Sequence, residues 1–497
     1  MESSPKQLPN PDDTSRPGVY VKTFGCQMNE YDSEKMLALL AKSYRPVQAP
    51  EDAELVIVNT CSVREKGEHK LFSLLGSLAE LKRTRPELVI GVGGCVAQQE
   101  GQQILKRNRA VDFVVGTHNL SLIPSLVNGA REGIAPQVAI DYREEWEELP
   151  DEFDAVPLLD PHEANDRTRF GLHLTPVRAL VAIQRGCDKM CSYCVVPNTR
   201  GKQVSRALEE IVKEVRLKVR LGAKEVLLLG QTVNSYGIDL QPRVRFETLI
   251  RKLAEIDGLH RIRFTAPHPA EVRPAFIELY GDVPQLCPHI HLPLQSGSDR
   301  ILKLMNRNYR RERYLEIVRS LRERLPSLAV TADIIVGFPT ETEEDFQDTL
   351  AVMQQVRYNS TYSFKYSERP HTAAREQFSS ADQVPPEVAH DRLLRLQALQ
   401  DSLSEETNAG WRGQVVEVLV EGPNKTISSW MRGRIPQNTL VELVQLDEAL
   451  PNPVAGELVH ARIVHSSPYG LRGELCRSEE NASPLDAANG VEGRASV

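Results

Sequence analysis

Three cysteines within eight residues, Cys187, Cys191 and Cys194, constrain the fold of this chain more than any other feature. They follow an apolar run, so three thiolates beyond the end of a strand can converge on one metal centre, and sulfur ligands suit an iron–sulfur cluster or zinc. A structural zinc site takes four ligands, and no fourth cysteine or C-x2-H pair lies nearby in the sequence. A four-iron cluster held by three cysteines leaves one iron open to substrate. The spacing therefore favours such a cluster over zinc or three unrelated core cysteines.

Cys26, Cys61 and Cys95 form a second set, each closing an apolar run near the N-terminus. Their separations of 35 and 34 residues match the length of one strand-and-helix repeat. Equivalent strand ends lie side by side in a parallel sheet, so the three sulfurs are expected to meet in the crevice where such folds bind ligands. Glycines beside Cys26 and Cys95 leave room for a bulky centre. The set predicts a second cluster with an open iron; the alternative is three buried cysteines that only pack.

The order of apolar and helical stretches predicts a multidomain α/β chain. Three β-branched runs, each followed by a helix-like stretch, predict a parallel α/β domain of the Rossmann or flavodoxin type over residues 17–133. Six further strand-like runs over residues 173–408 predict a complete or partial (β/α) barrel, with an open doubly wound sheet as the alternative. Short β-rich runs predict a small β-barrel over residues 409–477.

The segments outside these three regions are polar. Residues 1–16 and 478–497 lack periodicity and are expected to be disordered, and residues 134–172 are expected to form an acidic linker. Between Asp141 and Asp166 eleven acidic residues stand against one basic residue, a charge of −10 in a chain whose total is −8. The rest of the chain is therefore weakly basic, which permits contact with phosphates.

The beginning of the chain has no basic stretch leading into an apolar run, and its longest apolar strings are far shorter than a bilayer span. Eight cysteines among 497 residues without an export signal indicate metal ligation or redox chemistry rather than a disulfide scaffold. We therefore expect a cytoplasmic protein without membrane contact.

The C-x3-C-x2-C spacing resembles that of the radical S-adenosylmethionine (SAM) enzymes. Together with Gly25-Cys-Gln-Met-Asn29 and Gly433-Arg434 it resembles the radical SAM methylthiotransferases over about Val19 to Leu475, and most of all the MiaB-like branch that acts on N6-isopentenyladenosine in tRNA. Four strings carry the similarity: Cys194-Val-Val-Pro-Asn-Thr-Arg-Gly201, His291-Leu-Pro-Leu-Gln-Ser-Gly-Ser298, Asp333-Ile-Ile-Val-Gly-Phe-Pro339 and Phe364-Lys-Tyr-Ser-Glu-Arg-Pro370. Three residues depart from the branch's tyrosine, glycine and glycine, respectively: Asn198, Thr340 and His371.

The resemblance implies two [4Fe-4S] clusters and bound SAM. The radical SAM cluster would be held by Cys187, Cys191 and Cys194, and an auxiliary cluster by Cys26, Cys61 and Cys95, with all six cysteines catalytic. Candidate SAM contacts are Arg200, Gln231 and Asn234, with an ordinary loop turn as the alternative. Candidate substrate contacts are His268, Gln295, Ser296 and Arg434. The C-terminal barrel is expected to be a TRAM domain that binds RNA.

The implied activity adds a methylthio group to C2 of N6-isopentenyladenosine 37, beside the anticodon, to form 2-methylthio-N6-isopentenyladenosine. The central cluster would generate the radical that removes the C2 hydrogen, and the N-terminal cluster would carry the sulfur. The implied partners are the tRNA anticodon stem-loop, SAM, a reductase of the flavodoxin or ferredoxin type, and a sulfur donor. Basic residues that could hold tRNA phosphates, unless they only form a solvated helix face, are Arg300, Lys303, Arg307, Arg310 and Arg311.

Two sister activities share this domain plan: methylthiolation of threonylcarbamoyladenosine in tRNA and of a ribosomal-protein aspartate. The strings Val195-Val-Pro197 and Lys365-Tyr-Ser367 favour the isopentenyl substrate. An alternative of another class is a non-catalytic, zinc-containing RNA-binding protein, which would contain zinc in place of iron. Cys287 and Cys476 lack partners at metal-binding spacing and are expected to pack.

Overall fold

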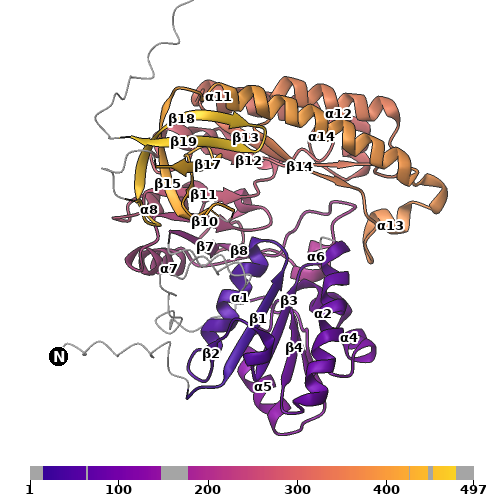
Figure 1. The fold of residues 1–497 in the computed structure, drawn as a ribbon. Coiled ribbons are helices and arrows are strands. Elements are labelled where there is room, and N and C mark those ends of the chain that lie inside the picture. The colour runs from indigo at the N-terminus through magenta and orange to yellow at the C-terminus, as the bar shows by residue number, and fades with distance from the viewer. Residues whose placement is uncertain (1–14, 63–64, 147–176, 425, 446–451, 477–497) are drawn as a thin grey trace, which may run out of the picture.

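The structure, a computed structural model, describes residues 15–62, 65–146, 177–424, 426–445 and 452–476 (Figure 1). The predicted C-terminal tail, most of the predicted linker and nearly all of the predicted N-terminal tail lie outside these residues. The described chain forms an N-terminal α/β part, a central partial barrel and a C-terminal closed β-barrel. In Figure 1 the N-terminal part lies at one end of the molecule, and the other two lie together at the opposite end.

The N-terminal part is a parallel sheet with helices on both faces, built from β1 (Gly18–Phe24), α1 (Gln27–Leu40), β2 (Arg45–Pro46), β3 (Leu55–Thr60), α2 (Glu65–Thr84), β4 (Val89–Gly93), α3 (Cys95–Glu100), α4 (Gln102–Arg107), β5 (Phe113–Val115), α5 (Ile123–Arg131) and β6 (Gln137–Ala139). The strand order is β2-β1-β3-β4-β5-β6. Successive residues of a strand point to opposite faces, so Val21 and Ile57 pack under α1 and α5, whereas Val56 and Val58 pack under α2 and α4. Because β6 pairs with β5, the sheet extends into the stretch expected to be linker.

The central part alternates parallel strands with helices: β7 (Arg178–Ala182), β8 (Gln184–Arg185), α6 (Val196–Arg200), β9 (Val204–Ser205), α7 (Leu208–Arg220), β10 (Glu225–Leu229), α8 (Phe246–Ala254), β11 (Arg261–Thr265), α9 (Pro274–Asp282), β12 (His289–His291), α10 (Asp299–Leu304), α11 (Arg311–Arg324), β13 (Ala329–Val336), α12 (Glu343–Val356), β14 (Ser360–Lys365), α13 (Ala373–Gln377) and α14 (Pro386–Ala409). Six of its strands form two parallel sheets, β7-β10-β11 and β12-β13-β14, and β8 pairs antiparallel with β9; among the described residues β14 does not pair with β7. The result is the partial barrel, open on one side.

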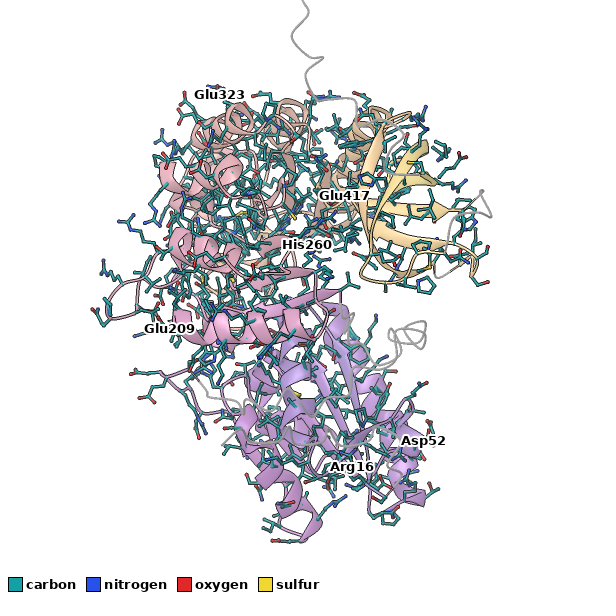
Figure 2. The ribbon with its side chains drawn as sticks, turned by 90° about the vertical axis from the view of Figure 1, so that its left-hand side faces the viewer. Arg16, Asp52, Glu209, His260, Glu323 and Glu417 are labelled. Atoms are coloured by element: carbon teal, nitrogen blue, oxygen red, sulfur yellow. The ribbon has the colours of Figure 1, made fainter. Side chains whose placement is uncertain are left out.

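The C-terminal part is a closed barrel of β15 (Val415–Pro423), β16 (Met431–Arg434), β17 (Leu440–Val444), β18 (Leu458–Ser467) and β19 (Gly470–Cys476), ordered β15-β16-β17-β19-β18. Alternate residues such as Val416, Val418 and Val420 fill its interior. The barrel packs against the N-terminal ends of the central strands: Arg261 donates to the carbonyl of Arg434 at 2.8 Å and pairs with Glu417 at 2.8 Å. Figure 2 shows Glu417 at this junction. The opposite, C-terminal ends of the central strands are therefore not covered by the described residues of this barrel, and active sites of (β/α) barrels lie at these ends.

A buried group of charges joins the N-terminal and central parts. Glu214 of α7 accepts from Lys35 of α1 at 3.2 Å and from Arg206, and Lys218 of α7 pairs with Glu34 of α1 at 3.0 Å. Burial alone would raise the pKa of the Glu214 carboxyl, but the neighbouring cations hold that pKa well below its usual range. This contact fixes how the two parts face each other.

Candidate active site

One cavity of about 310 Å³ is lined by all six cysteines that the sequence singles out. The N-terminal set enters it from the sheet ends, and the central set enters from the loop after β8. Gln231, His268, Gln295 and Asp333 also line it, from loops and strand ends of the partial barrel. The two sets therefore open onto a single space.

The N-terminal cysteines lie at the ends of three neighbouring strands, as predicted. Cys26 follows β1 and caps α1, Cys61 follows β3, and Cys95 follows β4 as the first residue of α3. The glycines beside them permit this close approach. A Cβ on Gly25 would lie 2.7 Å from the Cβ of Cys61, and one on Gly94, whose φ is +91°, would lie 2.2 Å from Oδ1 of Asn59.

The thiols of this set are coupled to one another. Hydrogen bonding from Cys61 lowers the pKa of Cys26 to about 6 and that of Cys95 to about 7, and the charge of Arg200 acts in the same direction. The pKa of Cys61, which serves as the shared donor, is raised. Cys26 and Cys95 therefore ionise readily, and thiolates are the ligands that an iron–sulfur cluster uses.

The central cysteines lie on one loop and owe their arrangement to local turns. Gly186 opens the loop at φ +73°, where a Cβ would lie 1.9 Å from the carbonyl oxygen of Lys202. Cys187 Sγ lies 3.3 Å from the hydroxyl of Thr232, and Arg307 Nη1 donates to Cys191 Sγ at 3.4 Å. Burial raises the pKa of Cys187, and it raises that of Cys194 to about 12. These thiols therefore need a metal centre to become thiolates at neutral pH.

Both sets fit a cluster with an open position. Gln231 lines the cavity, and its buried Oε1 has no hydrogen-bond partner among the described residues. An acceptor left open beside the central triad suits an ammonium group of a bound cofactor. In the described part of the chain no three His, Cys, Asp or Glu side chains are grouped to hold a single metal ion. A four-iron cluster spreads its ligands over several metal atoms and does not need that grouping.

The side chains of the other two predicted SAM contacts, Asn234 and Arg200, have partners in the described part of the protein, unlike the amide oxygen of Gln231. Both ends of the Asn234 side-chain amide bind the backbone of His268, donating at 3.0 Å and accepting at 2.8 Å, so Asn234 supports the His268 loop. Arg200 lines the cavity on the N-terminal side, where it pairs with Asp32 of α1 at 2.7 Å. A role for either residue in binding SAM stays a prediction.

Of the predicted substrate contacts, His268 and Gln295 line the cavity. Burial and the charge of Arg307 lower the pKa of His268 to about 3, so its ring is neutral. Ser296 is buried and does not line the cavity; its hydroxyl accepts from the backbone of Ser298 at 3.2 Å. Arg434 lies at the opposite ends of the strands, ion-paired with Glu421 at 2.9 Å, because its turn packs against the base of the central barrel. Arg434 therefore does not line this cavity, and its role as a substrate contact stays a prediction.

The five predicted phosphate-binding residues differ in their surroundings: two form ion pairs, two are exposed, and one faces a cysteine. Arg300 pairs with Asp345, and Arg311 pairs with Asp348 at 2.5 Å. Lys303 and Arg310 are exposed. Arg307 points inward to Cys191, a role that the sequence analysis missed because nothing in the local pattern marks a contact across 116 positions.

Two of the three departures from the resembled pattern have a backbone explanation. Thr340 and His371 adopt φ of +65° and +59°, a conformation that glycine adopts without strain. The side-chain amide of Asn198 donates to the carbonyl of His371, so two of the departures contact each other.

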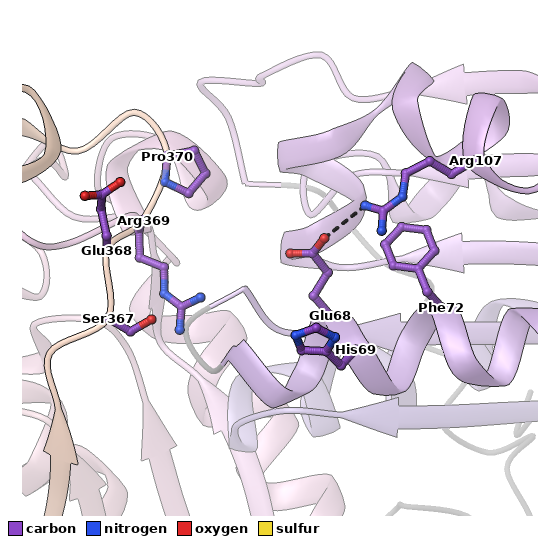
Figure 3. Close-up of a pocket in the computed structure, with 8 residues that line it drawn as sticks. All are labelled: Glu68, His69, Phe72, Arg107, Ser367, Glu368, Arg369 and Pro370. Atoms are coloured by element: carbon purple, nitrogen blue, oxygen red, sulfur yellow. Dashed lines mark hydrogen bonds and ion pairs between the residues drawn. The ribbon is translucent and has the colours of Figure 1, made fainter. Parts of the chain in front are cut away.

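A second cavity of about 310 Å³ lies between α2 and the loop that follows β14 (Figure 3). Glu68, Phe72 and Arg107 form one wall, where Arg107 pairs with Glu68 at 3.0 Å and its guanidinium stacks 3.4 Å from the ring centre of Phe72. Ser367 and Arg369 face them from the other wall. None of the six cysteines lines this cavity.

Comparison with known proteins identifies the family. Residues 18–116 match the family described as Uncharacterized protein family UPF0004, and residues 181–353 match the Radical SAM superfamily. A protein of Geobacter metallireducens named tRNA-2-methylthio-N(6)-dimethylallyladenosine synthase is 46% identical over 459 residues, which cover 92% of this chain and 98% of that protein. This chain belongs to that synthase family. Another member of the synthase family, from Burkholderia thailandensis, is 41% identical over 482 residues, covering 94% and 98% of the two chains.

Solved structures agree with the fold. The radical SAM methyltransferase TsrM of Kitasatospora setae, solved with cobalamin and a [4Fe-4S] cluster, superposes with a TM-score of 0.52 at 14% identity, covering 72% of this chain and 77% of that one. The cobalamin-dependent SAM radical enzyme OxsB gives 0.50 at 12% identity, covering 77% and 56%. The predicted fold class is confirmed: a parallel α/β domain, a radical SAM partial barrel and a small β-barrel consistent with TRAM. In the described part of this synthase-family chain, no helix has the length and apolar character of a membrane span.

Proposed function

We propose that this chain is a tRNA-2-methylthio-N(6)-dimethylallyladenosine synthase, which adds a methylthio group to C2 of N6-isopentenyladenosine 37 in tRNA. The observation that carries the proposal is the single cavity lined by both cysteine sets, in a chain of the family that bears this name. Replacing a C–H bond by a C–S bond requires hydrogen removal and sulfur delivery at the same carbon. Two reactive centres on one cavity meet that requirement.

Cys187, Cys191 and Cys194 would hold the [4Fe-4S] cluster to which SAM binds, and Cys26, Cys61 and Cys95 would hold a second cluster. When bound, these groups supply the one-electron chemistry that removes an unactivated hydrogen, and the sulfur that replaces it. The chain's own residues would position these groups and the substrate. Gln231 offers its open amide oxygen to the amino group of SAM.

The residues around the cysteines prepare the cavity for a nucleobase. His268 stays neutral at physiological pH and offers a polar, uncharged edge. Leu229, Pro267 and Pro293 line the same space with apolar surface, which limits the access of water. Asp333 also lines this space, and its Oδ2 lies 3.3 Å from Nε2 of His291.

Apart from adenosine 37, the tRNA anticodon stem-loop would make its contacts outside this cavity. Lys303 and Arg310 are exposed on the central part and can neutralise phosphates. The C-terminal barrel would add a second RNA surface. Each turnover consumes electrons and sulfur, so a reductase of the flavodoxin or ferredoxin type and a sulfur donor complete the proposed cycle, which takes place in the cytoplasm with its tRNA.

The test is mass spectrometry of tRNA nucleosides from cells that lack this protein. We expect N6-isopentenyladenosine to accumulate and its 2-methylthio derivative to disappear, and expression of the wild-type chain to restore the derivative. The Cys187→Ala chain, expressed to the same level, is the matched control and should restore nothing. Loss of methylthio groups from threonylcarbamoyladenosine, or from a ribosomal protein, would assign the enzyme to a sister activity instead.

A further inference from the structure

Each cysteine set has one arginine beside it, buried at Arg200 and half-buried at Arg307, and both arginines come from the central part of the chain. Arg307 follows α10 and faces the central set, whereas Arg200 ends α6 and faces the N-terminal set. Both line the shared cavity. The two arginines differ in how their charges are balanced.

Arg307 brings a full positive charge to the central set. Nη1 donates to Cys191 Sγ at 3.4 Å, Nε donates to the Tyr309 hydroxyl at 3.2 Å, and Nη2 donates to the carbonyl of Pro293 at 3.5 Å. The acceptors are a sulfur, a hydroxyl and a carbonyl oxygen, and no carboxylate among the described residues forms an ion pair with Arg307. Its charge is therefore directed at the sulfur.

Arg200 brings a charge that is already compensated. Its Nη2 lies 2.7 Å from Oδ2 of Asp32, and both side chains are buried. Helix α6 is fixed to the N-terminal part because Nε2 of His118 lies 2.9 Å from the Arg200 carbonyl oxygen and the Thr117 hydroxyl donates to the Thr199 carbonyl at 2.8 Å. The guanidinium still lowers the pKa of Cys26 and Cys95, so part of its field reaches these sulfurs.

We propose that these arginines set the reduction potentials of the two clusters unequally: Arg307 raises the potential of the SAM-binding cluster strongly, and the Arg200–Asp32 pair raises that of the second cluster only weakly. The inference rests on the proposed function, because it requires both clusters. One-electron reduction adds one negative charge to a cluster, and a nearby buried cation stabilises the more negative form. A carboxylate paired with that cation cancels most of the effect. The electron that arrives from the reductase is thereby directed to the cluster that consumes it.

The experiment is an EPR-monitored redox titration of the anaerobically reconstituted, full-length protein, with dithionite as the reductant. The signal of each cluster is assigned from variants in which the other cysteine set is replaced by alanine. In Arg307→Gln the ratio of reduced to oxidised SAM-binding cluster at a fixed potential should fall at least tenfold, a shift of about 59 mV for one electron. The potential of the second cluster should not move.

Asp32→Asn provides a test in which a reduction potential should rise rather than fall. This substitution keeps the size of the side chain and removes the compensating charge, so the potential of the second cluster should rise while that of the SAM-binding cluster stays constant. Damage to the fold would not raise a potential selectively. Arg307→Lys, which keeps the charge, should retain most of the wild-type potential, and it carries the test if Arg307→Gln fails to bind its cluster. Arg313→Gln, which breaks an exposed ion pair with Glu316, is the matched control and should move neither potential.

Equal shifts of both clusters in Arg307→Gln, or an unchanged or lowered second potential in Asp32→Asn, would overturn the inference. Failure of the proposed function is distinguishable from failure of this inference. If the proposed function is wrong, the reconstituted wild-type chain will bind one cluster or none, which is seen before any titration. Two intact clusters with unmoved potentials would reject only the roles of the arginines.

Discussion

The two cysteine sets reach the same cavity by different structural routes. The central set occupies one loop within eight residues, and turns of that loop arrange it. The N-terminal set is spread from residue 26 to residue 95, and the parallel order β1-β3-β4 brings it together. A loop motif can be recognised in sequence whatever the rest of the chain does, whereas a set at strand ends exists only when the whole sheet has formed.

The thiols of the two sets also differ in acidity. In the N-terminal set the pKa of Cys26 and of Cys95 is lowered by hydrogen bonding from Cys61, whereas in the central set burial raises the pKa of Cys187 and Cys194. Cys26 and Cys95 of the N-terminal set thus ionise near neutral pH without a metal, whereas ionisation of Cys187 and Cys194 would depend more on the metal itself.

The largest expected effect comes from removing one set at a time. Replacing Cys187, Cys191 and Cys194 with alanine should reduce SAM cleavage to background, because no cluster remains to bind and reduce SAM. Replacing Cys26, Cys61 and Cys95 should preserve SAM cleavage and abolish methylthiolation. Chromatography and mass spectrometry of SAM cleavage products and of tRNA nucleosides measure both. Methylthiolated product from the second variant would show that the two sets do not divide the reaction.

Glu214→Gln tests the contact that makes the two sets share a cavity. Removing this charge leaves buried Lys35, Arg206 and Lys218 without their common carboxylate, and we expect a loss of about 3–5 kcal/mol in the free energy of unfolding. Urea denaturation of the metal-free protein measures it. Glu316→Gln, at the exposed pair with Arg313, should cost less than about 0.5 kcal/mol. Equal losses in the two variants would mean that the buried charges do not hold the parts together.

Alkylation by iodoacetamide tests the difference in thiol pKa between the two cysteine sets. In the metal-free protein at pH 7, Cys26 should react at least about tenfold faster than Cys194, because the thiolate is the reacting form and the pKa values are lowered to about 6 and raised to about 12, respectively. Peptide mass spectrometry over a time course measures both rates. In denaturant the two rates should converge, and equal rates in the folded protein would contradict the stated acidities.

The smallest effect concerns His118, which binds the end of α6 beside the N-terminal set. Burial and the charge of Arg185 lower the pKa of His118 to about 4. The unfolded chain therefore takes up a proton first as the pH falls from about 6.5 toward 4, so stability is complete above that window and declines through it. Between pH 7 and pH 5 we expect a loss of about 1 kcal/mol from this ring.

The control for this effect is His118→Gln, which keeps hydrogen-bonding capacity and does not titrate. The urea midpoint of this variant should vary less with pH than that of the wild type over the same window. A pH dependence that the substitution leaves unchanged would assign it to other groups.

The sequence by itself determined the features that depend on local pattern. The spacing of Cys187, Cys191 and Cys194 predicted one convergent loop, and the repeat length separating Cys26, Cys61 and Cys95 predicted three neighbouring strand ends. Alternation of strands and helices predicted the partial barrel. These features follow from periods of two and 3.6 residues and from repeat length, which neighbouring residues encode.

Only the tertiary structure decided which distant groups meet. It turned Arg307 inward to Cys191, paired Arg200 with Asp32, and placed Arg434 at the base of the central barrel. An arginine in a basic helical stretch looks the same in sequence whether it faces solvent or a sulfur. The choice depends on how separate elements pack, through contacts that span 116 to 173 positions and that no local period records.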